Sequence, residues 1–204
     1  MLVTAFTLIS SIAQCSDPNV PAGGFAIDER FDLAITFSDT HTTTADVRYP
    51  LDAPGACGWP MVVFIHGLYG SKSSMANFAQ DFARNGYLTI AFDVRGHASA
   101  TGEHAYFGLR ERLDLAEVIF WAQATFSDRA DPERIGVAGG SQGAIFSWDG
   151  AAWSGEPFEP NPWIDGAYPE VDAIVVDNLT ADFASTFAAR GRAAVLVRAS
   201  CRIT

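Results

Sequence analysis

The feature that most constrains this chain is a serine set between two glycines, where an apolar run meets a helical pattern. Residues 135–138 are apolar and predict a short buried strand, and residues 142–148 predict a helix. Gly139 and Gly143 lie two residues either side of Ser141, where a sharp turn leaves no room for larger side chains. Such a turn lifts the serine hydroxyl clear of a sheet and points the N-terminus of the next helix at it.

This local pattern favours nucleophilic chemistry. A Gly-x-Ser-x-Gly sequence between a strand and a helix is the pattern of a nucleophile elbow. The backbone N–H of Gln142, at the start of the predicted helix, is then placed to stabilise an oxyanion. The same pattern also arises by chance in glycine-rich loops, so the prediction depends on the strand before Ser141 and the helix after it.

The rest of the chain alternates between strand and helix patterns. Alternating polarity predicts an antiparallel hairpin near the N-terminus, and continuous apolar runs predict strands buried on both faces. Together they predict an α/β protein with a mostly parallel sheet flanked by helices and an antiparallel hairpin at its N-terminal edge. The predicted strands cover residues 31–37, 42–49, 61–65, 87–92, 135–138, 173–176 and 193–197, the predicted helices cover 75–85, 111–126 and 142–148, and a turn is predicted at 131–133.

Composition is that of one soluble domain with a sizeable core, because 49% of the 204 residues are hydrophobic and 18% are charged. We expect residues 28–204 to form a partial domain that follows a leader or extension at residues 1–27. The net charge of −11 argues against nucleic acid and anionic membrane surfaces as partners. The three cysteines and four histidines have neither the spacing of metal ligands nor that of a disulfide framework, and we expect no metal or other cofactor.

The N-terminus predicts export. Residues 1–14 are apolar and rich in small side chains, like the hydrophobic part of a secretory leader, although they include no basic residue and are too short to span a bilayer. We therefore expect a secreted or periplasmic protein, and a cytoplasmic one if the segment is only a frayed extension. Membrane association is expected only if Cys15 is lipidated, and Gln14 occupies the position where such signals have a small residue.

A second group of residues follows the predicted strand 61–65. Ligand sites of parallel sheets gather at the carboxyl ends of the strands, and here that end is followed by His66 and Gly67. A glycine lets the backbone pass close to a nucleophile, so the N–H of Leu68 or Tyr69 is a candidate for a second oxyanion donor. The alternative is a tight turn that needs glycine for its geometry alone. We predict a structural, hydrogen-bonding role for His66.

A third group follows the strand 87–92. Asp93 and Arg95 directly follow the end of this strand, and we expect them to form an ion pair that fixes the following loop. We predict a structural role for this pair and no part in the chemistry.

A crossover segment at residues 153–168 is rich in aromatic side chains. It predicts either a lid whose aromatic residues line a pocket over Ser141, or a proline-rich connection whose aromatic residues fill the core. The residues concerned are Trp153, Phe158, Trp163 and Tyr168.

In their order and spacing, the three groups resemble the landmarks of the α/β-hydrolase superfamily. The resemblance covers residues 28–177 and rests on His66-Gly67 with Gly70, Asp93-x-Arg95-Gly96-His97 with Gly102, and Gly139-x-Ser141-x-Gly143. It implies that Ser141 is the nucleophile, that Gln142 and either Leu68 or Tyr69 supply the oxyanion N–H groups, and that an acyl-enzyme forms on an ester, thioester or amide. The substrate would be a small molecule or a peptide. The turn and the elbow look like those of the prolyl-oligopeptidase-like and X-prolyl dipeptidyl-peptidase-like branches.

The chain departs from that family at the general base. A serine needs a base oriented by a carboxylate, and in this fold the order along the chain is serine, acid, histidine. Asp177 and Asp182 are candidate acids after Ser141, with Asp177 directly after the strand 173–176, where it could instead cap the next helix.

No histidine follows Ser141, since His41, His66, His97 and His104 all precede it. Three explanations stay open. The chain is a truncated piece of a longer hydrolase with an incomplete α/β-hydrolase fold, or His97 or His104 joins an unusual triad, or the protein is a catalytically silent relative that binds a ligand.

Overall fold

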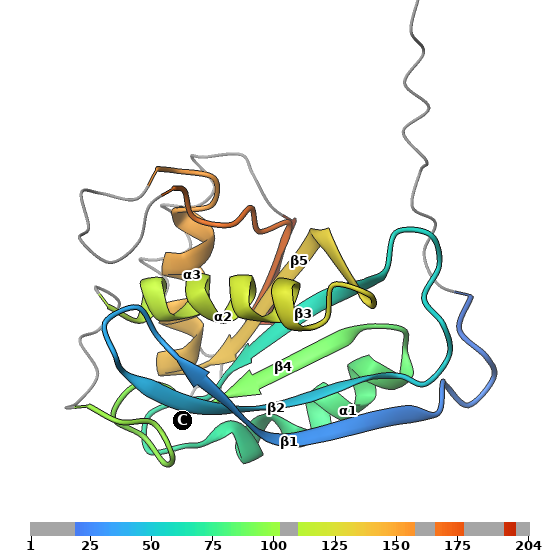
Figure 1. The fold of residues 1–204 in the computed structure, drawn as a ribbon, viewed down its shortest axis with the longest axis horizontal. Helices are drawn as coiled ribbons and strands as arrows, with labels where there is room; N and C mark the ends of the chain where they lie inside the picture. The colour runs from blue at the N-terminus through green and yellow to red at the C-terminus, as the bar shows by residue number, and fades with distance from the viewer. Residues whose placement is uncertain (1–18, 103–109, 158–165, 178–193, 199–204) are drawn as a thin grey trace, which may run out of the picture.

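A seven-stranded sheet forms the centre of the computed structural model, which describes residues 19–102, 110–157, 166–177 and 194–198 (Figure 1). The strand order is β1-β2-β4-β3-β5-β6-β7. The strands are β1 (Ile27–Thr36), β2 (Thr42–Pro50), β3 (Trp59–Ile65), β4 (Leu88–Phe92), β5 (Ala130–Gly140), β6 (Ala173–Asp177) and β7 (Ala194–Arg198). The helices are the short 3₁₀ helix η1 (Lys72–Met75) and the α-helices α1 (Ala76–Arg84), α2 (Glu111–Thr125) and α3 (Gln142–Ala152).

Strand directions follow the predicted class. β1 and β2 form an antiparallel hairpin, β2 pairs antiparallel with β4, and every other pair is parallel. Each parallel connection that the structure describes in full passes through a helix, as a parallel pair requires. The α/β class, the mostly parallel sheet and the N-terminal hairpin are therefore confirmed.

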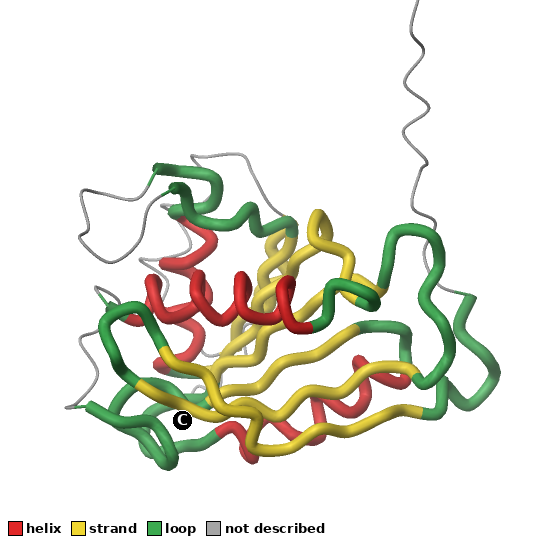
Figure 2. Tube along the Cα trace, in the orientation of Figure 1, coloured by secondary structure: helices red, strands yellow, loops and turns green. Residues whose placement is uncertain are grey.

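Helices cover both faces of the sheet, with α2 and α3 on one side and α1 on the other (Figures 1 and 2). The pleat of β3 explains why its apolar run is continuous. Met61, Val63 and Ile65 face the larger core under α2 and α3, whereas Val62 and Phe64 face the smaller core under α1. All seven residues of β3 are buried, which places it at the centre of the molecule.

The predicted turn at 131–133 lies inside β5 rather than before it. The pairing of β3 with β5 jumps from Trp59 opposite Ala130 to Met61 opposite Ile135, so the intervening residues form an irregularity in the strand. There the Asp131 carboxylate accepts the Glu133 N–H at 2.9 Å, a local bond typical of a turn.

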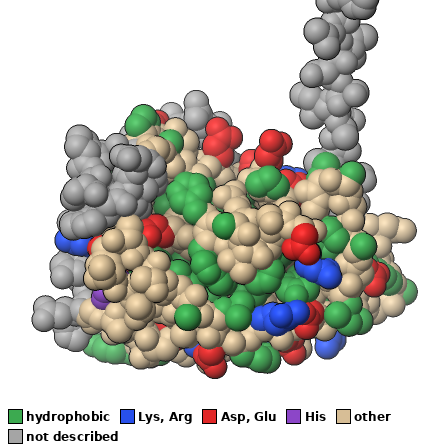
Figure 3. Space-filling model, in the orientation of Figure 1, with side chains coloured by type: hydrophobic (Ala, Val, Ile, Leu, Met, Phe, Trp, Pro, Cys, Tyr) green, Lys and Arg blue, Asp and Glu red, His purple; other side chains and the backbone are tan. Residues whose placement is uncertain are grey.

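Cys57, in the loop before β3, is disulfide-bonded, which the cysteine spacing did not predict. Cys15, Cys201 and the predicted leader at 1–14 lie outside the described residues. Among the described helices, none has both the length and the apolar character needed to cross a membrane. On the face shown in Figure 3, acidic and basic side chains are dispersed among apolar ones.

Candidate active site

Ser141 is the single residue between the end of β5 and the start of α3. Its backbone has φ 54° and ψ −119°, a conformation that side-chain-bearing residues rarely adopt. The residue is exposed, and its side chain makes no capping hydrogen bond to α3. The structure thus places this exposed serine on a strained turn.

The flanking glycines are required by close packing, of Gly143 against the end of β3 and of Gly139 against the start of α3. A Cβ on Gly143 would overlap the carbonyl oxygen of Ile65 and lie 2.7 Å from that of His66. A Cβ on Gly139 would overlap the carbonyl of Gly143. Both obstacles are backbone atoms, which cannot swing aside. The explanation of the glycines by lack of space is confirmed.

The turn after β3 lies directly against Ser141. A Cβ built on Gly67 would lie 3.3 Å from the Cβ of Ser141. The Gly70 N–H donates to the Gly67 carbonyl at 3.0 Å, and Tyr69 has φ 59°, so residues 67–70 form a β-turn of type II. Leu68 is half exposed and Tyr69 is 92% exposed. The two candidate oxyanion residues therefore belong to a turn whose first residue lies against the serine.

His66 fixes the orientation of this turn. Its Nε2 accepts the Val94 N–H at 3.0 Å, so the ring proton resides on Nδ1 and is donated to the Gly67 carbonyl at 2.8 Å. Burial lowers the pKa of His66, which keeps this ring neutral. The C=O and N–H of a trans peptide point in opposite directions, so the Leu68 N–H is directed away from the two donors that hold Gly67. The structural role predicted for His66 agrees with these contacts.

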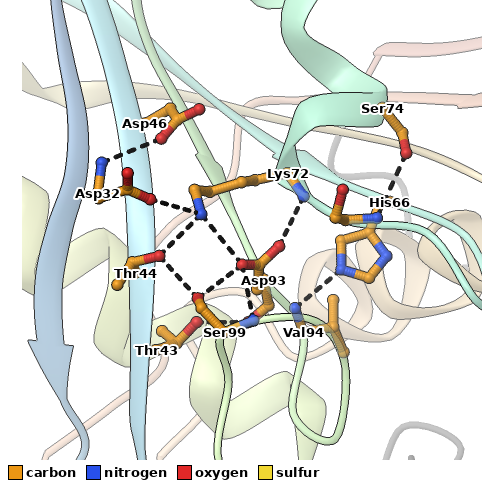
Figure 4. A network of polar contacts seen from close by, with 11 residues as sticks. Asp32, Thr43, Thr44, Asp46, His66, Lys72, Ser74, Asp93, Val94 and Ser99 are labelled. Carbon is orange, nitrogen blue, oxygen red and sulfur yellow. Dashed lines mark hydrogen bonds and ion pairs between the residues drawn. The ribbon is translucent and has the colours of Figure 1, made fainter.

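Asp93 and Arg95 do not pair with each other, contrary to the prediction. Asp93 binds Lys72 and Ser99 (Figure 4), while Arg95 donates from Nε and Nη2 to Asp114, at 2.8 and 2.5 Å. Both partners are buried, so each charge is neutralised by a residue from another element. The sequence could not indicate Lys72 and Asp114 as partners, because each lies about twenty positions away along the chain.

Comparison with known proteins agrees with this geometry. A sequence model of the α/β hydrolase fold matches residues 60–152, which include β3, the turn, β4 and the elbow. An esterase of Pyrococcus furiosus, Pf2001, superposes with a TM-score of 0.55 and 24% identity, over 75% of this chain and 52% of the esterase. The chain has the α/β-hydrolase fold.

Two further relatives extend the likeness. The hypothetical protein PA2218 from Pseudomonas aeruginosa superposes with a TM-score of 0.57 and 18% identity, over 80% of this chain and 51% of that protein. An uncharacterized 31.7 kDa protein from the traX-finO intergenic region of Escherichia coli is 32% identical over 95 residues, 46% of this chain and 32% of that protein. The chain thus spans about half the length of these solved relatives and a third of the curated one.

The candidate acid Asp177 lies at the carboxyl end of β6, next to the strand that leads into the elbow. Asp177 ends β6, and its Cα is paired with that of Gly140, the residue before Ser141. Its side chain is not among those described, and Asp182 and His104 lie outside the described residues.

None of the described histidines forms a hydrogen bond with Ser141. Both nitrogens of His66 are engaged, as given above. His97 follows β4, which β3 separates from β5, and its Nδ1 lies 3.1 Å from the carbonyl of Arg95. His41 stacks on Phe37. The described residues thus show no histidine that is hydrogen-bonded to Ser141, and the involvement of His97 in a triad stays a prediction.

The described aromatic residues of the crossover pack away from the elbow. Trp153 directly follows α3, whose eleven residues place its end about 16 Å from its start. Arg112 lies 4.4 Å over the Trp153 ring and donates to the Tyr168 hydroxyl at 3.1 Å. For Trp153 and Tyr168, these contacts favour a packed connection over a lid. Phe158 and Trp163 lie outside the described residues. In the described part of the chain, no three His, Cys, Asp or Glu side chains are arranged to hold a metal ion.

Proposed function

We propose that this chain carries the nucleophile and oxyanion site of a serine hydrolase, which cleaves an ester through an acyl-enzyme on Ser141. One observation carries the proposal: Ser141 combines a strained backbone, an exposed side chain and direct contact with the turn at 67–70. A hydrolytic serine needs to be reached by substrate while its oxyanion donors stay fixed, and this arrangement supports both requirements.

In the proposed reaction, the Ser141 hydroxyl oxygen attacks the carbonyl carbon of the substrate. The negative oxygen that develops is stabilised by the N–H of Gln142, which the first turn of α3 leaves without an intrahelical partner. The second donor is the N–H of Leu68 rather than that of Tyr69, because the two hydrogen bonds to the Gly67 carbonyl turn the Leu68 N–H outward.

The proton of Ser141 must pass to a base. We propose Asp177 as the carboxylate that orients this base, on the strength of its place beside Gly140. The base itself would be a histidine from a part of the protein beyond this sequence, in keeping with the serine, acid, histidine order. The substrate is proposed to be an uncharged small-molecule ester. The Pyrococcus furiosus esterase supports an ester, and the net charge of −11 disfavours an anionic substrate. A peptide bond, expected from the two peptidase-like branches, is the alternative.

The test uses the full-length protein that contains this chain and its Ser141→Ala variant. A fluorophosphonate probe should label the unsubstituted protein, p-nitrophenyl butyrate should be hydrolysed, and Ser141→Ala should lose both. Hydrolysis of a peptidyl p-nitroanilide instead of the ester would show that the substrate is a peptide bond, as expected from the two peptidase-like branches. Labelling that persists in Ser141→Ala would disprove the role of this serine.

A second candidate function has one observation in its favour. Since none of the described histidines is hydrogen-bonded to Ser141, a catalytically silent protein that binds its ligand beside the elbow is the competing proposal. It predicts saturable ester binding without turnover in the full-length protein.

We also infer a secreted or periplasmic location. Disulfides persist in oxidising compartments, so the disulfide at Cys57 supports export together with the apolar residues 1–14.

A further inference from the structure

Lys72 is the single lysine of the chain, and it is buried, with 8% of its surface exposed. Its Nζ donates to the Asp93 carboxylate at 3.1 Å, to the Asp32 carboxylate at 2.9 Å and to the Thr44 hydroxyl at 2.8 Å (Figure 4). A buried ammonium group is costly unless it is paired and hydrogen-bonded. Here all three of its protons have acceptors, from β1, β2 and the end of β4.

The same aspartate also holds the backbone of Lys72. The Lys72 N–H donates to Asp93 Oδ1 at 2.7 Å, while Ser99 donates to Oδ2 from its hydroxyl at 2.6 Å and its N–H at 3.2 Å. Asp93 is 1% exposed, so water does not compete for these bonds. This carboxylate therefore joins the loop after β3 to the loop after β4.

The turn at 67–70 is consequently anchored at both ends. Before it, His66 accepts the Val94 N–H, and after it Lys72 binds Asp93. Asp93 and Val94 are consecutive residues directly after β4, so both anchors rest on one short piece of backbone. With its two ends fixed to one support, the turn has little freedom to change its orientation beside Ser141.

The N-terminal hairpin contributes Asp32, the exposed partner of Lys72. β1 has a register shift between Arg30 and Leu33, where Asp32 adopts φ 54°. The Asp32 N–H donates to the Asp46 carboxylate at 3.2 Å, which holds this bulge in place. The side chain of Asp32 is 74% exposed, yet its carboxylate reaches back to Lys72. A bulge that re-aims a side chain in this way is a common device beside functional sites.

We propose that Lys72 is a positioning residue for the oxyanion turn, and that Asp32 couples the N-terminal hairpin to that turn through it. The effect on hydrolysis rests on the proposed function, whereas the effect on the turn does not. Fixed donors are worth more than mobile ones because they need no reorganisation as charge develops. Loss of Lys72 would thus lower kcat and leave substrate binding nearly unchanged.

The experiment compares Lys72→Met, which keeps the length of the side chain without its charge, with Lys72→Arg, which restores a cation. Arg30→Met is the matched control, because it removes an exposed cation from the hairpin that carries Asp32 and leaves Lys72 in place. The Gly70 amide, bonded to the Gly67 carbonyl, reports on closure of the turn by hydrogen exchange. The Val63 amide in β3 reports on global stability.

For Lys72→Met we expect some loss of global stability, because the buried Asp93 loses its cation, and we expect Gly70 exchange to accelerate about tenfold more than Val63 exchange. The kcat for p-nitrophenyl butyrate should fall about tenfold or more with KM within about twofold. Lys72→Arg should recover most of both losses, and Arg30→Met should change neither. Unchanged Gly70 exchange in Lys72→Met would overturn the proposal. If Lys72→Met does not fold, Asp32→Asn decides: faster Gly70 exchange supports the coupling, and unchanged exchange refutes it. Absence of Ser141-dependent hydrolysis in the unsubstituted protein would remove the proposed function, while the exchange results would still decide the role of Lys72.

Discussion

At the scale of single residues, two side-chain-bearing residues with positive φ belong to the candidate site. Tyr69 at 59° and Ser141 at 54° both occupy a region where glycine is the easier choice. Conformations of this kind cost roughly 1–3 kcal/mol each and persist where the surroundings enforce them. Here the surroundings are the packed glycines of the elbow and the two hydrogen bonds to the Gly67 carbonyl.

His66 makes part of this support dependent on pH. Protonation of Nε2 would remove the acceptor of the Val94 N–H. Burial lowers the pKa of His66 below the ordinary value of 6.5 and His97 adds to this effect, while the hydrogen bond to the Gly67 carbonyl and the charge of Asp93 oppose it. Between the folded and unfolded pKa values the unfolded state binds more protons, so stability falls as pH drops below about 6.5. We expect His66→Gln to flatten this dependence in urea denaturation measured from pH 5 to 8.

His41 is the control for that measurement. Burial and Arg95 also lower its pKa, so His41→Gln should remove a separate part of the same slope. Equal slopes in the unsubstituted protein and in His66→Gln would contradict the assignment of Nε2 as an acceptor.

At the scale of elements, the elbow between β5 and α3 has no room for a side chain at Gly143 but has room for one at Gly140. The Cβ of Gly143→Ala would collide with backbone carbonyls of β3, whereas a Cβ at Gly140 would meet nothing within 4 Å. We expect Gly143→Ala to lower the free energy of unfolding by about 1–3 kcal/mol, the usual cost of overpacking. Gly140→Ala is the matched control and should stay within about 0.5 kcal/mol of the unsubstituted protein, as measured by denaturation in urea. A similar loss in both variants would show that the elbow is sensitive to any side chain.

Elements and their order could largely be predicted from the sequence, because local patterns decide them. The apolar run at 61–65 and the helical spacing at 111–126 correspond to β3 and α2, and the glycines around Ser141 indicated the elbow. The partners of buried charges could not be predicted, since they depend on which distant elements the sheet brings together. Lys72 meets Asp93 and Asp32 for that reason. Its status as the chain's single lysine was the available signal, and it has meaning only once its burial is known.

At the scale of the whole molecule, the sheet order links the N-terminal hairpin to the candidate site through β4. β2 pairs with β4 on one side, and β3 pairs with β4 on the other. Lys72 bridges the same elements through side chains. A change in the hairpin can therefore reach the turn beside Ser141 through two routes, backbone pairing and the lysine contacts.

The disulfide at Cys57 is a further constraint on the whole molecule, and it connects the loop before β3 to a second cysteine. The sequence offers Cys15 and Cys201. Loss of a native disulfide typically costs about 2–5 kcal/mol, and for a chain of this size each kcal/mol lowers Tm by about 2–4 °C. We expect Cys57→Ser, or reduction with dithiothreitol, to lower Tm accordingly, and dithiothreitol to have no further effect on Cys57→Ser.

Peptide mapping by mass spectrometry without reduction identifies the second cysteine. A Cys15–Cys57 peptide would exclude a lipid on Cys15 and, with it, the proposed route to membrane association. A Cys57–Cys201 peptide would leave Cys15 available for modification. A free Cys57 thiol in protein purified without reductant from an oxidising compartment would remove the disulfide, and with it the structural support for export.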